Sequence, residues 1–159
     1  MPYNKKVILK LIKRKRVDLL NKQVKVKLKT TIRQPNEEPE IYELWANGTI
    51  IEKRGNSYLK YEEMQDDNKI NTTVKMGETE GLILRSGGVN MRLPFLENEE
   101  QTGSYESEFG VLMVSTMTRK IAFEKTENEG NFVVQYDLTV SGQPVGEYTL
   151  EFHYTEGSQ

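Results

Sequence analysis

The run NFVVQYDLTVSGQPVGEYTLEFHYT, residues 131–155, carries the clearest structural signal in this chain. Every second side chain from Phe132 to Val140 is apolar or aromatic, and the alternation returns from Tyr148 to Tyr154. A period of two places these side chains on one face of a β-strand and the polar residues between them on the other. The Ser-Gly-Gln-Pro segment at 141–144 is typical of a turn. The run therefore predicts two antiparallel strands joined by a tight connection.

Strands of the same kind are predicted upstream of this run. Ile121 and Phe123 lead into a turn at 127–130, which adds a third strand to the meander. Asn47-Gly48 predicts either a hairpin or, as at the corners of barrels, a glycine bend within a long strand. Residues 97–101 are predicted to form an acidic loop. Shorter strands are predicted at residues 42–52, 57–63, 70–76, 82–85, 89–93, 104–107 and 111–118, with turn signals at 54–56, 66–68 and 86–88.

The first predicted strand, from Gln23 onward, has one apolar and one basic face. Its apolar face carries Val24, Val26, Leu28, Thr30 and Ile32. The opposite face carries Lys25, Lys27, Lys29 and Arg33, which we call the basic stripe.

This succession of strands, with no helical pattern between them, favours an all-β fold over an α/β fold. We expect a closed antiparallel up-and-down barrel of eight to ten strands, because closure removes the exposed edges of an open sheet. The 159 residues suit one domain, and a composition of 36% hydrophobic and 29% charged residues suits strands that are apolar on one face. We assign residues 22–159 to the barrel and residues 1–21 to a basic N-terminal extension, helical or disordered.

The N-terminal extension has a weak amphipathic pattern, with Val7, Ile8, Leu11, Ile12 and Leu19 on one side of a helical wheel. Its apolar run is too short for a secretory signal, and the chain has no run of about 18 apolar residues that could span a membrane. The sequence therefore predicts a cytoplasmic protein. An in-frame alternative start codon between residues 17 and 20 would remove the extension, so its translation stays open.

Charge divides the chain into two parts. Residues 1–33 carry a net charge of +11 and residues 34–159 carry −13, although the whole chain carries only −2. Docking on RNA or a ribonucleoprotein through the basic stripe and the N-terminal arm is the alternative function, because basic side chains neutralise phosphates. Aromatic residues are absent between Tyr3 and Tyr42, so no platform for base stacking is visible there. A membrane-surface role of the basic segment is a third interpretation, although the segment lacks Trp and Phe.

Catalysis finds little support in the sequence. Cysteine is absent, which excludes thiol nucleophiles and Cys-ligated metal sites. His153 is the single histidine and is expected to be a surface side chain, because metal and triad chemistry needs several converging groups. Glu62 and Glu63 are neighbours in a strand and point to opposite faces, so they cannot form a carboxylate pair. We predict a protein that is not an enzyme and that uses no cofactor or metal.

A small ligand inside the barrel is the leading functional hypothesis. Barrels of about eight strands are either filled by side chains or hold one small molecule. An arginine in an apolar interior needs an anionic partner, which would be a ligand group or a barrel carboxylate such as Glu63. An open pocket lined by Arg and Tyr would favour a ligand, whereas a filled barrel would favour a surface interaction. The side chains that we expect near such a cavity are Tyr58, Tyr61, Arg85, Arg92 and Tyr105.

Four blocks of residues, in this order and spacing, resemble the YwiB-like family of bacterial proteins. They are Tyr58-Leu-Lys-Tyr-Glu-Glu63, Arg85-Ser-Gly-Gly-Val-Asn-Met91, Tyr105 with Phe109-Gly110, and Tyr136-Asp137. The resemblance runs from about Lys22 to the C-terminus and implies a calycin-like (lipocalin-like) closed barrel. It implies no activity and no site residues, because the family is a domain of unknown function. True lipocalins carry a Gly-x-Trp motif near the first strand, whereas here Glu43 stands two residues before Trp45, at the position of the glycine. Carriage of a small molecule, as in lipocalins, therefore follows only by analogy of fold.

The sequence thus predicts a cytoplasmic barrel that binds a small ligand, partly apolar or anionic, or that interacts through its surface. The identity of the partner and the oligomeric state, including a homodimer, stay open.

Overall fold

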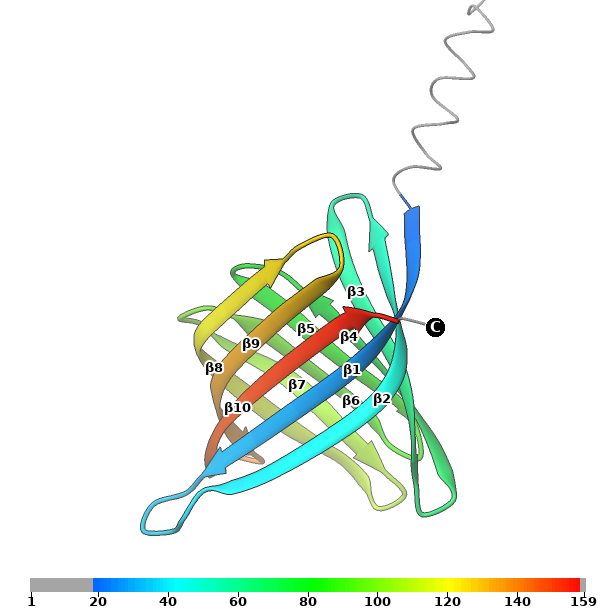
Figure 1. Ribbon diagram of the computed structural model, residues 1–159. Helices are drawn as coiled ribbons and strands as arrows, with labels where there is room; N and C mark the ends of the chain where they lie inside the picture. Colours follow the sequence, from blue (N-terminus) through cyan, green and yellow to red (C-terminus); the bar gives the residue numbers. More distant parts are fainter. Residues whose placement is uncertain (1–18, 158–159) are drawn as a thin grey trace, which may run out of the picture.

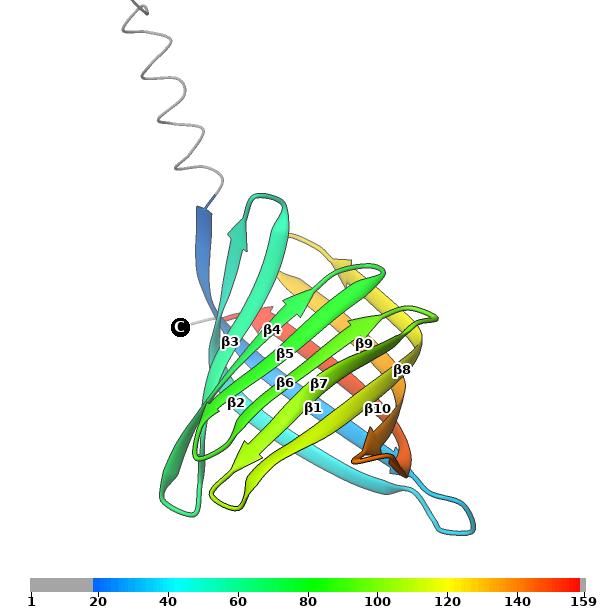
Figure 2. The same cartoon turned by 180° about the vertical axis from the view of Figure 1, so that it is seen from behind.

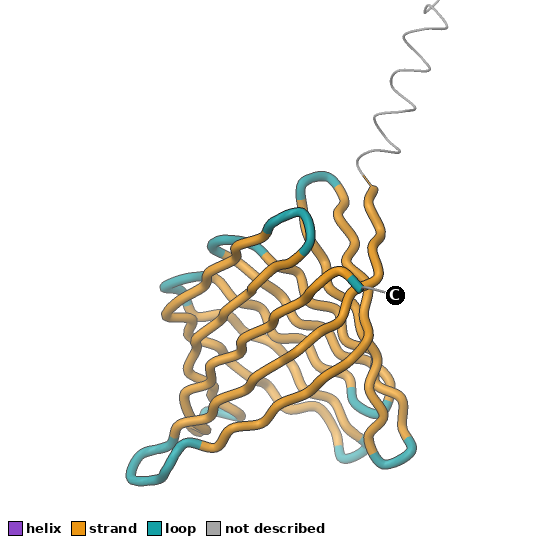
Figure 3. Tube along the Cα trace, viewed as in Figure 1, coloured by secondary structure: helices purple, strands orange, loops and turns teal. Residues whose placement is uncertain are grey.

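Ten strands follow one another along the chain and close into one antiparallel barrel (Figures 1 and 2). The computed structural model describes residues 19–157. Within these residues short loops join the strands, and no helix occurs (Figure 3). The strands are β1 (Leu19–Arg33), β2 (Glu40–Lys53), β3 (Asn56–Gln65), β4 (Asn68–Met76), β5 (Glu80–Gly87), β6 (Asn90–Leu96), β7 (Glu100–Ser107), β8 (Gly110–Lys125), β9 (Glu129–Val140) and β10 (Gln143–Glu156).

Each strand pairs with its neighbours in the sequence, and β1 closes the ring by pairing with both β2 and β10. The β1–β10 ladder runs from Val24 opposite Glu156 to Arg33 opposite Glu147. The predicted closed antiparallel barrel is therefore confirmed, with ten strands. Asn47-Gly48 lies inside β2, so of the two predicted alternatives the bend within a long strand is the one that forms.

The alternation in β9 and β10 builds the core, as the sequence predicts. Phe132 and Val134 are fully buried and lie opposite Phe152 and Leu150 of β10. The ring of Phe132 contacts those of Phe123 and Phe152, with centroids 6.0 and 6.2 Å apart. Burial of such apolar surface is the main favourable term in folding. The other strands add buried apolar side chains to the same cluster, among them Val26, Ile50, Leu59, Val74, Met76, Phe95 and Ile121.

β8 is one long strand with a bulge, and the prediction of two separate strands here is wrong. Its register with β9 shifts between Thr118 and Lys120, as happens when one extra residue enters a ladder. The Glu97 side chain supports the strand beyond the bulge, because the Ile121 N–H donates to Glu97 Oε2 at 3.0 Å. At the bulge the consecutive basic residues Arg119 and Lys120 are both exposed. In the sequence, this pair interrupts the alternation in the same way as the end of a strand does.

Gly48 allows β2 to bend and to change partners. A Cβ atom at this position would lie 2.7 Å from the Lys60 carbonyl oxygen and 2.9 Å from Val26 Cγ2, so a larger residue would force the strands apart. β2 pairs with β3 from Gly48 onward, whereas residues 40–47 pair with β1 alone. β2 and β3 therefore diverge at Gly48, and the β1–β2 and β3–β4 turns lie on opposite sides of the barrel (Figures 1 and 2).

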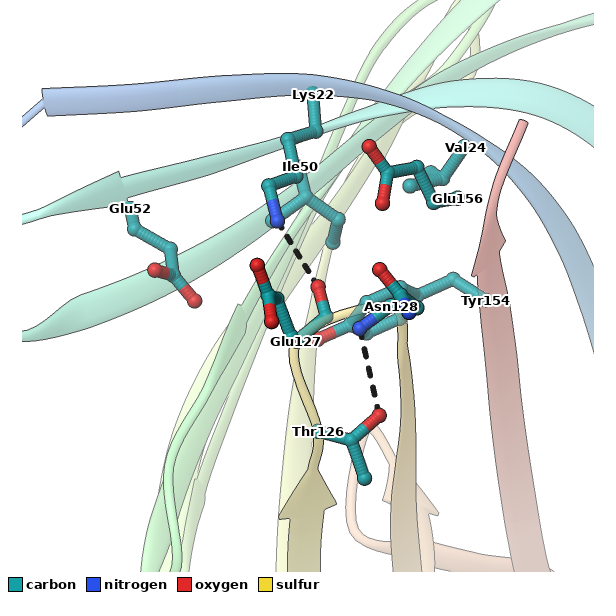
Figure 4. Close-up of a pocket in the computed structure, with 9 residues that line it drawn as sticks. All are labelled: Lys22, Val24, Ile50, Glu52, Thr126, Glu127, Asn128, Tyr154 and Glu156. Atoms are coloured by element: carbon teal, nitrogen blue, oxygen red, sulfur yellow. Dashed lines mark hydrogen bonds between the residues drawn. The ribbon is translucent and has the colours of Figure 1, made fainter. Parts of the chain in front are cut away.

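The two ends of the barrel differ. The upper end in Figure 1 holds the β2–β3, β4–β5, β6–β7 and β8–β9 turns, and the lower end holds the other five turns. At the upper end the β8–β9 turn reaches β1, where Lys22 Nζ donates to the Glu127 carbonyl oxygen at 2.9 Å (Figure 4). Lys125 Nζ also lies 2.6 Å from Glu52 Oε1 of β2. The pocket between these groups holds about 20 Å³, enough for about one water.

Two differences from the predicted segment boundaries concern the N-terminus and the acidic loop. β1 begins at Leu19, so residues 19–21 of the predicted extension pair with β2 as part of the strand. The helical pattern predicted between Val7 and Ile12 lies outside the described residues. β7 begins at Glu100, which makes the acidic loop shorter than predicted. In the part of the chain that the structure describes, no helix could span a membrane.

Candidate functional site

The lower half of the barrel is hollow. Two lobes open between the inner faces of the strands, with volumes of about 260 and 360 Å³. They share Met91, Leu93, Tyr136 and Tyr148 in their linings, and we treat them as one cavity, the lower cavity. β2 borders the first lobe through Leu44, in the half of the strand that has left β3. The divergence of β2 and β3 thus opens the barrel on the side where this lobe lies.

The first lobe, the polar lobe, is built around an ion pair. Arg85 of β5 points inward and its Nη2 donates to Glu63 Oε1 of β3 at 2.6 Å. Both side chains are 24% exposed, so the pair is largely removed from water. β4 lies between the two strands, and its Thr72 stands directly opposite both Tyr61 and Arg85. Tyr61, Thr72 and Arg85 therefore form one row across the wall, with Glu63 one pleat nearer the lower end.

Thr72 and Tyr61 present hydroxyl groups in this wall. Thr72 is 2% exposed, and its Oγ1 has no hydrogen-bond partner of normal geometry among residues 19–157. The Thr72 hydroxyl lies close enough to the Tyr61 phenol to have a lowering effect on the pKa of Tyr61. The two groups nevertheless do not form a hydrogen bond of normal geometry. Burial, followed by the charge of Glu63, raises the pKa of Tyr61 to about 12. The phenol is therefore neutral at physiological pH and can donate a hydrogen bond.

The second lobe, the apolar lobe, is lined by aliphatic and aromatic side chains. Tyr148 stacks on Tyr136 with ring centroids 5.5 Å apart, and both rings line this lobe as well as the polar lobe. Burial raises the pKa of both phenols, which keeps the two rings neutral. The rest of the lining comes from β6, β7, β8 and β9 and is almost free of polar atoms: Met91, Leu93, Tyr105, Leu112, Val114, Leu138 and Val140.

Comparison with known proteins places the chain in a family. A sequence profile described as "Domain of unknown function (DUF1934)" matches residues 26–152. The chain belongs to the DUF1934 family. It is similar to the "Uncharacterized beta-barrel protein YwiB" of Bacillus subtilis (strain 168), with 30% identity over 119 residues that cover 75% of this chain and 84% of the relative. It also resembles the crystal structure of the ywiB protein from Bacillus subtilis, with a TM-score of 0.80, 26% identity and coverage of 90% of this chain and 98% of that one.

These matches confirm the YwiB-like resemblance that the four sequence blocks predict. They describe a β-barrel protein of unknown function.

Three of the five residues that were predicted to lie near a cavity do line one of the two lobes. Tyr61 and Arg85 line the polar lobe, and Tyr105 lines the apolar lobe. The predicted partner of an interior arginine, Glu63, is the one that Arg85 contacts.

The prediction that Tyr58 and Arg92 face the interior is wrong. Tyr58 precedes the inward-facing Leu59, so it lies on the outer face of β3, opposite Lys75 of β4. Arg92 lies between Met91 and Leu93, which both line the cavity, and it is exposed on the outer face of β6. Strand alternation requires both outcomes.

The basic stripe lies on the outer face of β1, as predicted, but acidic residues of the neighbouring strands flank it. Lys29 stands between Glu43 of β2 and Glu151 of β10, and Arg33 stands opposite Glu147. Lys27 Nζ lies 3.5 Å from Glu43 Oε2 and 5.3 Å from the centre of the exposed Trp45 ring. Lys25 has the uncharged neighbours Asn47 and Thr155. The charge of the stripe is thus largely balanced within the sheet.

The remaining candidates for chemistry lie on the surface. His153 faces outward on β10, and its Nδ1 lies 2.8 Å from Asn131 Oδ1. Glu62 points away from the cavity and pairs with Lys69 at 3.2 Å, on the opposite face from Glu63. Among residues 19–157, no three His, Asp or Glu side chains converge as a metal site would require.

Several lining residues were not among the predicted site residues. Thr72, Leu138 and Tyr148 belong to the inward alternation of their strands, and Met91 lies within one of the family blocks. Alternation identifies them as interior residues, but it does not distinguish a side chain that packs against a partner from one that faces a hollow.

Proposed function

We propose that this protein binds a small, partly apolar molecule in the lower cavity and performs no chemistry on it. The observation that carries this proposal is the contrast between the two halves of one barrel. Phe132, Leu59 and Val74 fill the upper half without exposure to solvent, whereas the lower half keeps a cavity. Interiors of folded proteins pack as densely as organic crystals, so a cavity of this size needs a reason.

The dimensions and the lining support a small ligand. Ligand pockets typically hold about 300–1,000 Å³ and combine an apolar lining with a few convergent polar groups. Taken together as one cavity, the two lobes of about 260 and 360 Å³ fall within this range. The convergent polar groups are those of Tyr61, Glu63, Thr72 and Arg85, which gather on one wall.

The polar groups suit binding better than catalysis. Arg85 and Glu63 compensate each other, and the raised pKa of Tyr61 keeps its phenol in the poorly nucleophilic neutral form. The buried hydroxyl of Thr72 lacks a partner among the described residues and would gain one from a ligand.

The alternative proposal, docking on RNA through the basic stripe, has no comparable support from the described residues. Phosphate binding depends on uncompensated positive charge. Glu43, Glu147 and Glu151 stand beside the basic residues of the stripe and reduce that charge.

Native mass spectrometry of protein purified from its host tests the proposal. We expect wild type to carry a small-molecule adduct that denaturation releases. Val140→Phe, which puts a larger side chain into the apolar lobe, should lose the adduct. Val133→Phe makes the same change at the outer face of the same strand and should keep the adduct. Bare wild-type protein, or an adduct that all three proteins carry equally, would contradict binding in the lower cavity.

A further inference from the structure

We propose that the ligand's polar end is uncharged and offers both a hydrogen-bond acceptor and a hydrogen-bond donor, as a primary carboxamide does. Arg85 would donate to the acceptor and Glu63 would accept from the donor. This inference rests on the proposed function and narrows it to one class of ligand.

The charge inside the lower cavity is balanced before any ligand enters. Of the described residues that line the two lobes, only Arg85 and Glu63 carry a charge, and they contact each other at 2.6 Å. A carboxylate at this wall would gain from Arg85 but would lie beside the carboxylate of Glu63. An ammonium group would meet the converse problem at Arg85. Because the Arg85 and Glu63 side chains are each only 24% exposed, charges beside them are screened less than in bulk water, and each of these groups loses much of its attraction to a like-charge contact.

The ion pair keeps hydrogen-bonding capacity on both sides. A guanidinium has five N–H donors, and Arg85 uses one of them on Glu63 within the described part of the chain. Glu63 accepts that bond on Oε1, which leaves Oε2 as an acceptor. A carboxamide carries one carbonyl oxygen and an NH₂ group, so it matches a neighbouring donor and acceptor without adding charge.

The neighbouring hydroxyl groups extend the same pattern. Thr72 Oγ1 is buried, borders the polar lobe and can donate or accept a hydrogen bond. Its position opposite Arg85 in the ladder places it beside the group that the ligand would contact. The apolar lobe then receives an aliphatic chain attached to the polar end, since both lobes share Met91 and Leu93 in their linings.

Three probes that differ only in the polar end test this inference: octanamide, octanoate and octylamine. Calorimetric titration of the full chain at neutral pH should give octanamide a Kd at least about tenfold lower than that of either charged probe, which corresponds to about 1.4 kcal/mol. Equal or tighter binding of octanoate or octylamine would overturn the inference and leave the proposed function standing. If none of the three probes binds, the proposed function itself fails.

Two variants and a matched control test the role of the ion pair. Glu63→Gln leaves Arg85 uncompensated, so octanoate should bind to this variant at least about tenfold more tightly than it binds to wild type. Arg85→Gln should favour octylamine in the same way. Glu62→Gln removes the neighbouring carboxylate on the outer face and should leave all three affinities unchanged. Unchanged preferences in folded Glu63→Gln and Arg85→Gln proteins would overturn the inference. If neither variant folds, the comparison of the three probes on wild type decides.

Discussion

Arg85 Nη2 lies 2.6 Å from Glu63 Oε1, across β4 and inside the half of the barrel that side chains leave hollow. Removing one partner leaves the other as a largely buried charge. We expect Arg85→Met and Glu63→Gln each to lower the free energy of unfolding by about 1–3 kcal/mol. The double variant should be less destabilised than the two single effects predict, with a coupling energy of about 0.5–3 kcal/mol in urea denaturation. The exposed pair of Glu62 and Lys69 is the control, because Glu62→Gln should change stability by less than about 1 kcal/mol.

Thr72 and Thr118 form a matched pair for testing the polar lobe. Each has a buried Oγ1 without a hydrogen-bond partner among the described residues, but only Thr72 borders the lower cavity. Replacing an unsatisfied buried hydroxyl by a methyl group removes a desolvation cost, so Thr72→Val and Thr118→Val should leave the free energy of unfolding unchanged or raise it by about 1 kcal/mol. Only Thr72→Val should weaken octanamide binding. Equal weakening by both variants would show that the cavity wall is not the binding surface.

Gly48 is the position where β2 leaves β3, and its close contacts predict a stability effect. Gly48→Ala would place a Cβ atom 2.7 Å from the Lys60 carbonyl oxygen. We expect a loss of about 1–3 kcal/mol in the free energy of unfolding, or about 2–12 °C in Tm for a chain of this size. Asn47→Ala, at the exposed neighbouring position, should change Tm by much less. A thermal melt in which the two variants agree would contradict the proposed role of the bend.

The buried phenol of Tyr61 predicts a pH dependence at the alkaline side. Burial and the charge of Glu63 raise its pKa to about 12 from the ordinary value of 10.0. Between these two values the unfolded chain releases the proton and the folded chain keeps it, so stability falls as pH rises through this window. The free energy of unfolding should therefore decrease less steeply between about pH 10 and 12 in Tyr61→Phe than in wild type. Parallel slopes for the two proteins would show that Tyr61 titrates normally.

The fold could be predicted from the sequence because its signals are local. The alternation from Phe132 to Tyr154 is visible within one strand at a time, and up-and-down connections need only neighbouring strands to pair. The bulge in β8 was missed because a single extra residue looks the same as the end of a strand.

The candidate site was less predictable, for two different reasons. Tyr58 was misplaced although its distance of three residues from Tyr61 already puts the two on opposite faces of one strand. The hollow itself has no local signal. Leu138 of the cavity and Val134 of the core continue the same alternation in β9, and only the packing of the whole barrel separates them.

Methyl-labelled methionine offers the most direct test that the lower half of the barrel is an accessible binding cavity. Met91 lines both lobes, Met76 lies in the packed core, and Met64, Met113 and Met117 are exposed on the outside. NMR titration with whichever of the three octyl probes binds most tightly should shift the Met91 methyl resonance and give contacts between it and the octyl chain. The resonances of Met76, Met64, Met113 and Met117 should stay in place. An unperturbed Met91 resonance at saturating probe, or contacts at Met113 and Met117 instead, would contradict the account.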